Sequence, residues 1–151
     1  MMDVCLIKDC LFFMVLLLAA WQDSVWKSIS MRFLLAAGML GVGFSAVLNR
    51  NLLQVAASVA IGVLLLFLSK WTYGGIGEGD GWFFVVSGFY IDWQKNLCLF
   101  LSGLFLCFGL SLCVIVLRIL RRKRENITFP FLPFLLPAGI LMMSDFVRCL
   151  P

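Results

Sequence analysis

Long apolar runs separated by short polar breaks are the feature that most constrains this chain. Runs approaching about 20 apolar residues are typical of helices that cross a bilayer. Hydrophobic residues make up 63% of the 151 residues and charged residues 13%, whereas a soluble domain carries about a quarter charged residues. The polar surface is too small to coat a water-soluble particle, so we expect an integral membrane protein.

The apolar runs predict six membrane spans joined by short connections. We expect them over residues 4–22, 33–48, 52–69, 82–91, 97–117 and 129–147, with a polar break at 92–96. This pattern predicts an all-α, polytopic membrane helix bundle that forms a single domain over residues 1–151.

The basic residues predict the orientation of the bundle. With six spans, one side would hold eight of them, namely Lys27, Arg32, Lys70, Arg118, Arg121, Arg122, Lys123 and Arg124. The other side would hold four, namely Lys8, Arg50, Lys95 and Arg148. Cytoplasmic connections carry the excess of lysine and arginine, so we expect the first side to be cytoplasmic. Asp23 and Asp80 would both lie on it.

Several chemistries are excluded by what the chain lacks. It has no histidine, and none of its six cysteines forms a CxxC pair, which removes Ser-His-Asp and Cys-His catalysis and the common zinc sites. The glycine-rich segment 74–81 has no Gly-Lys-Ser/Thr and follows no strand, so it is not a phosphate loop. We expect neither a metal nor a cofactor, and no nucleic-acid partner.

The glycine-rich segment places an aspartate where the fourth span begins. Five of the eight residues from 74 to 81 are glycine, and glycine permits the close approach of another backbone. Asp80 follows these glycines. One interpretation is that it caps the helix. The other is that it is a functional acid, as ionisable residues at a membrane span commonly are.

A second aspartate, Asp23, follows the first span directly. It lies between Trp21 and Trp26, so it could be part of an interfacial anchor. Its position on the same side as Asp80 suggests a pair. Two neighbouring carboxylates in a partly desolvated place share one proton. The ionised member can activate a water, and the protonated member can polarise a carbonyl, which is aspartic protease chemistry.

Three stretches together resemble the type IV prepilin peptidase family, the membrane aspartic proteases of the GxGD class. The first is Asp23, with Ile29 six residues later, where the family often has D-x5-I-P-N. The second is Gly75–Asp80, which fits G-x-G-x-G-D and is followed by Ser87-Gly88. The third is Ile127–Leu135, which is similar to the I-P-F-x-P-F-L that begins the last span of the family.

The resemblance implies a peptidase in the bacterial inner membrane with its active site on the cytoplasmic side. It would cut the short basic leader from prepilin-like precursors, and its partners would be those precursors and membrane lipid. Carried over by position, Asp23 and Asp80 would be the catalytic pair, and Gly75, Gly77 and Gly79 would shape the loop.

The chain also departs from the family pattern. Ser30-Met31 follows Ile29 where the family has Pro-Asn, and Trp82 stands where a lysine often lies. No N-terminal domain with paired CxxC motifs is present, so the resemblance implies a short, peptidase-only form. Two alternatives remain. The aspartates could line the path of a small ion-coupled transporter, or the chain could be a non-catalytic membrane subunit of a pilus or secretion assembly.

Overall fold

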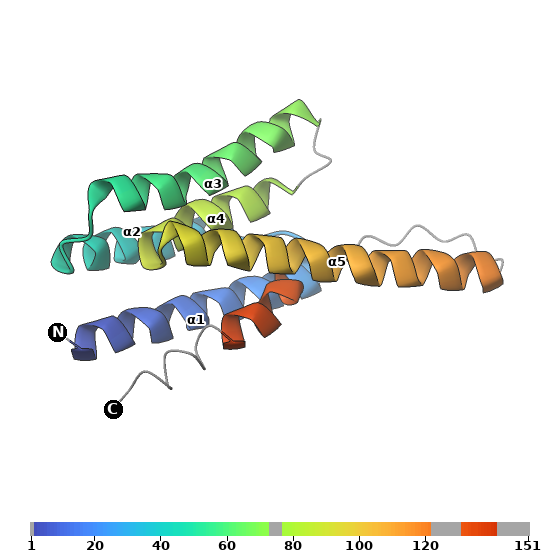
Figure 1. Cartoon of the computed structure of the whole chain (residues 1–151), viewed down its shortest axis with the longest axis horizontal. Coiled ribbons are helices and arrows are strands. Elements are labelled where there is room, and N and C mark those ends of the chain that lie inside the picture. Colours follow the sequence, from blue (N-terminus) through green and yellow to red (C-terminus); the bar gives the residue numbers. More distant parts are fainter. Residues whose placement is uncertain (1, 73–76, 122–130, 142–151) are drawn as a thin grey trace.

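A computed structural model describes residues 2–72, 77–121 and 131–141 of the chain (Figure 1). In order, the elements are α1 (Met2–Trp26), α2 (Met31–Val47), α3 (Leu52–Trp71), α4 (Glu78–Tyr90), α5 (Trp93–Arg121) and the 3-10 turn η1 (Leu132–Leu135). Among the described residues there is no strand. The predicted fold class, an all-α membrane bundle, is therefore confirmed.

Three of these helices are long and apolar enough to cross a membrane, over Val4–Trp26, Leu52–Trp71 and Trp93–Leu117. Two apolar helices are shorter, Met31–Val47 and Leu132–Leu141. Large apolar side chains are exposed along the outer faces of the bundle, where a bilayer would cover them. The chain is a membrane protein. The expected sixth span extends beyond the described residues at both of its ends.

Several predicted boundaries are wrong, and the expected 82–91 span in fact belongs to α4, which already begins at Glu78. The first helix does not end at residue 22 but continues to Trp26, so Asp23 lies within its last turn. The predicted polar break at 92–96 is shorter than expected, because α5 already begins at Trp93 and only Ile91 and Asp92 separate it from α4. A first helical turn tolerates polar residues, since its N–H groups have no partner within the helix. Asn96 moreover finds its own partners inside the bundle.

Helix α4 is the most enclosed helix, because glycines let α3 approach it closely. A Cβ atom at Gly62 would clash with the backbone nitrogen of Val85, and one at Gly88 would lie 2.7 Å from the nitrogen of Val59. The two helices thus touch through their backbones, which is the way small residues bring membrane helices together. Figure 1 shows them side by side.

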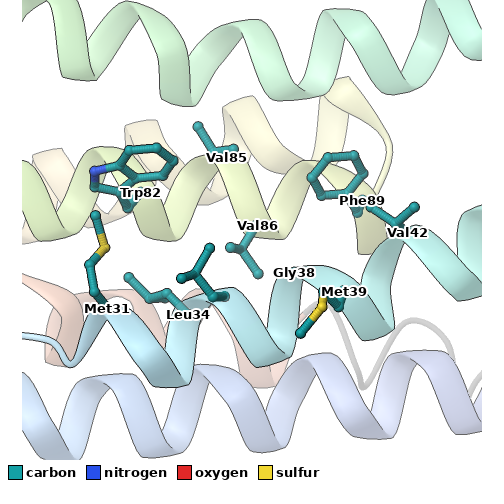
Figure 2. A pocket seen from close by; sticks show the side chains of 10 residues that line it. Met31, Leu34, Gly38, Met39, Val42, Trp82, Val85, Val86 and Phe89 are labelled. Atoms are coloured by element: carbon teal, nitrogen blue, oxygen red, sulfur yellow. The ribbon is translucent and has the colours of Figure 1, made fainter.

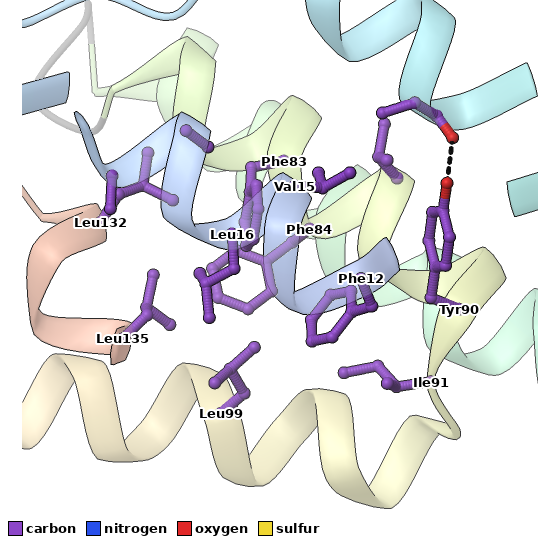
Figure 3. Packing of buried hydrophobic residues seen from close by; sticks show 14 of the residues in the cluster. Phe12, Val15, Leu16, Phe83, Phe84, Tyr90, Ile91, Leu99, Leu132 and Leu135 are labelled. Atoms are coloured by element: carbon purple, nitrogen blue, oxygen red, sulfur yellow. Dashed lines mark hydrogen bonds between the residues drawn. The ribbon is translucent and has the colours of Figure 1, made fainter. Parts of the chain in front are cut away.

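Helix α2 packs on another face of α4 in a similar manner. A Cβ atom at Gly41 would lie 2.7 Å from the ring of Tyr90. The hydroxyl of Tyr90, which is fully buried, donates a hydrogen bond to the backbone oxygen of Ala37 at 2.6 Å (Figure 3). This bond satisfies a buried polar group and fixes the register of α2 against α4.

A buried polar network ties α3, α4 and α5 together. The side-chain nitrogen of Asn96 donates to the backbone oxygen and to the hydroxyl of Ser58, each at 3.1 Å. The hydroxyl of Ser87 donates to the side-chain oxygen of Asn96 at 2.8 Å. All three side chains are almost completely buried. Each polar group has a partner, which is what a low-dielectric interior demands.

The apolar core lies between α1, α4, α5 and η1 (Figure 3). Its fully buried members include Leu16, Phe83, Phe84, Leu99, Leu132 and Leu135. At one end of the bundle Arg50 forms an ion pair with Asp92 and donates to the backbone oxygen of Phe89 at 3.1 Å. These contacts join the α2–α3 and α4–α5 connections. The end of α1, which carries Asp23, and the start of α4, which carries Asp80, lie at the opposite end (Figure 1).

Candidate active site

Asp23 is held inside the protein, in the last turn of α1. Only 9% of the surface of Asp23 is exposed. The backbone N–H of Leu132 donates a hydrogen bond to its Oδ2 atom at 3.0 Å, across 109 positions of the sequence. A backbone donor of this kind stabilises the charge of a carboxylate. Asp23 is therefore a buried acid whose orientation is fixed by this hydrogen bond.

Asp80 is the third residue of α4, and its carboxylate folds back over the helix start. Gly77 occupies the N-cap position, so the alternative that Asp80 caps the helix from that position is wrong. A Cβ atom at Gly77 would lie 2.9 Å from the Oδ2 atom of Asp80. Gly77 thus makes room for the carboxylate. Gly75, the first of the predicted loop glycines, lies outside the described residues.

Gly79, the third predicted loop glycine, makes room for Ile29. A Cβ atom at Gly79 would lie 3.2 Å from the Cδ1 atom of Ile29. Ile29 belongs to the connection that follows Asp23, and Gly79 immediately precedes Asp80. The apolar contact therefore fastens together the two segments that carry the aspartates.

The end of α1 and the start of α4 lie at the same end of the bundle (Figure 1), so the structure brings the two carboxylates together. Asp80 is located ahead of the apolar residues that begin at Trp82. Burial raises the pKa of Asp80 to about 7, and the negative charge of Asp23 contributes further to this rise. The charge of Asp23 thus opposes the ionisation of Asp80.

An apolar groove runs between α2 and α4 (Figure 2). Its volume is about 370 Å³. The residues that line it include Met31, Leu34, Gly38, Trp82, Val86 and Phe89. Met31 and Trp82 form one end of the groove (Figure 2). Met31 lies two residues after Ile29, and Trp82 lies two residues after Asp80. The groove is thus suited to an apolar ligand that reaches the aspartates along the bundle.

Three parts of this arrangement were not predicted from the sequence: the Leu132 donor, the groove and the Asn96 network. The prolines around residue 133 indicate an irregular backbone there, but nothing in the sequence predicts that the backbone of Leu132 contacts Asp23. In the described ranges, no three His, Cys, Asp or Glu side chains are grouped to hold a metal ion.

A comparison with curated proteins gives no match, and a comparison with solved structures gives none. The profile of the type IV leader peptidase family matches residues 10–114, which is more than half of the chain. The matched region contains both Asp23 and Asp80. It also contains the end of α1 and the start of α4, which lie at the same end of the bundle. The chain therefore belongs to the type IV leader peptidase family.

Proposed function

We propose that the chain is a membrane aspartic endopeptidase that cuts the basic leader from prepilin-like precursors. The observation that carries the proposal is the Asp23–Asp80 pair. These carboxylates come from distant parts of the sequence, Asp23 is buried and Asp80 partly buried, and the charge of Asp23 acts on Asp80. Membership of the type IV leader peptidase family supports a peptidase.

Two carboxylates and one water molecule are sufficient to hydrolyse a peptide bond. An ionised carboxylate accepts a proton from a water, and the oxygen of that water bonds to the peptide carbonyl carbon. The protonated carboxyl polarises the carbonyl oxygen and donates its proton to it. In the second half of the reaction the C–N bond breaks, and the leaving amine takes up a proton from the pair. The raised pKa of Asp80 suits it to the role of proton donor near neutral pH.

The apolar groove supports a precursor in which an apolar segment follows the cut site. Such a segment could lie against α2 and α4 while the bond to be cut reaches the aspartates. The excess of basic residues on the side that carries Asp23 and Asp80 supports a cytoplasmic active site. A basic leader would then be cut before its precursor is exported.

The decisive experiment is co-expression with a precursor that has a short basic leader, followed by mass spectrometry of the new N-terminus. We expect Asp23→Asn and Asp80→Asn each to lower the cleavage rate by about a hundredfold or more, because asparagine can neither take up nor release the proton. The double variant should cleave no more slowly than either single variant, since both residues serve one step.

Glu78→Gln is the matched control. Glu78 lies in the same turn as Asp80 but is exposed, so its change should leave cleavage intact. Asp92 is less suitable for this purpose because it is paired with Arg50. Normal cleavage by both asparagine variants would overturn the proposal and return the chain to the transporter or assembly-subunit alternatives.

A further inference from the structure

The hydrogen bond between Leu132 and Asp23 makes the two aspartates unequal. The donor is a backbone N–H, and the acceptor is a carboxylate that is almost completely buried. The backbone of Phe131 lies beside it and also contacts the Asp23 carboxylate. Within the described part of the chain, the Asp80 carboxylate has no comparable backbone donor.

The segment that supplies this donor is held firmly against α1 and α5. The side chains of Leu132 and Leu135 are fully buried. Gly103 of α5 leaves room for Leu135, since a Cβ atom there would lie 3.1 Å from its Cδ2 atom. The ring of Phe131 packs against that of Phe100. Because these contacts fix the turn on both flanks, the N–H of Leu132 is already oriented toward Asp23 in the folded protein.

A hydrogen bond to the charged form of an acid favours that form. When two carboxylates share one proton, the member with the donor keeps the charge and the other takes the proton. We propose that the backbone N–H of Leu132 positions Asp23 and maintains it as the ionised, water-activating member of the pair, which leaves Asp80 as the proton donor. This inference rests on the proposed peptidase function and assigns the roles within its site.

The sharpest test removes the N–H alone. Replacing Leu132 by its α-hydroxy analogue converts the Phe131–Leu132 amide to an ester, which retains the side chain and deletes the donor. Hydrogen bonds to charged groups are stronger than those between neutral groups. We therefore expect the loss of this one to lower kcat about tenfold to a hundredfold. KM should stay within about twofold, because the donor acts on the chemical step rather than on substrate binding.

An ester at Phe134 is the matched control. The N–H of Phe134 donates to the backbone oxygen of Phe131 at 3.1 Å, in the same turn. Its loss weakens the turn as much but does not touch Asp23. Equal effects of the two esters, an unchanged kcat for the Leu132 ester, or its failure to fold would each overturn the proposal. The last result would assign the bond to folding.

The outcome is separable from the proposed function. If Asp23→Asn cleaves normally, the peptidase mechanism fails and takes this assignment with it. If Asp23→Asn is inactive while the Leu132 ester keeps its kcat, only the role of the Leu132 donor is refuted.

Discussion

Gly62 of α3 lies directly against the backbone of Val85 in α4, and the space between them cannot hold a Cβ atom. A Cβ atom at Gly62 would also come within 2.6 Å of the backbone carbon of Phe84. We expect Gly62→Ala to destabilise the protein by about 1–3 kcal/mol, because a methyl group would force the two helices apart. Chemical unfolding in detergent, followed by circular dichroism, measures this change.

Gly109→Ala is the control for this prediction. Gly109 lies in α5, and a Cβ atom there would have no neighbour within 4 Å. Alanine is the better helix former by roughly 0.5–1 kcal/mol, so this variant should be as stable as the parent chain or slightly more so. Equal loss of stability in both variants would show that the α3–α4 contact is looser than described.

The pKa of Asp80 gives a pH dependence with a definite sign. Because that pKa is raised to about 7, Asp80 stays protonated below this pH and loses its proton as the pH rises through it. A proton donor must be protonated to act. We therefore expect kcat to fall as the pH increases from about 7 to about 9. A rate that rises over this interval, measured with a purified precursor, would contradict the assigned role.

The groove between α2 and α4 predicts how precursor binding can be weakened. Gly38 lines it, and a Cβ atom there would make only ordinary contact with Val86 at 3.5 Å. The larger side chain of Gly38→Leu should occupy the groove and displace apolar substrate surface. We expect KM to rise about tenfold, because the substrate would lose the binding free energy of about one buried apolar side chain. The value of kcat should be retained.

Gly43→Leu serves as the comparison for the groove. Gly43 is in the same helix, does not line the groove and has open space around it. Its change should leave KM unaltered. A KM that responds equally to both substitutions, or to neither, would exclude the groove as the binding place of the apolar segment.

The arrangement of the connections predicts which positions face the cytoplasm. In a variant without native cysteines, we expect Ser28→Cys and Lys70→Cys to react with an impermeant thiol reagent only after the membrane is opened. Asn49→Cys and Lys95→Cys, on the other side, should react in intact spheroplasts. These four residues are exposed. The reverse labelling pattern would show that the bundle has the opposite orientation, with the aspartates on the outer side of the membrane.

Most of the helices could be predicted because apolar runs report directly on membrane helices. The predicted 52–69 span corresponds closely to α3, for example, and 33–48 to α2. The boundaries near Asp23 and Asn96 were missed for a common reason. Both residues are polar, and polarity signals a connection, yet each finds its partner inside the bundle from a residue far away in the sequence.

The site was predictable only in part. The glycines around Asp80 indicated a close approach, and the structure identifies the neighbours as the Asp80 carboxylate itself and Ile29. The meeting of Asp23 with Leu132 depends on how the last described segment packs on α1 and α5. No local pattern encodes a contact across 109 positions.

The enclosed position of α4 has a consequence for how the protein is made. With 13 residues, α4 is shorter than the roughly 20 that a helix needs to integrate into a bilayer by itself. It also carries Glu78, Asp80 and Ser87, and what stabilises it is backbone contact with α3 and a hydrogen bond to α2. The translocon should therefore release α3 and α4 as one hairpin. Asp80 would then reach Asp23 only once this hairpin has packed against α1.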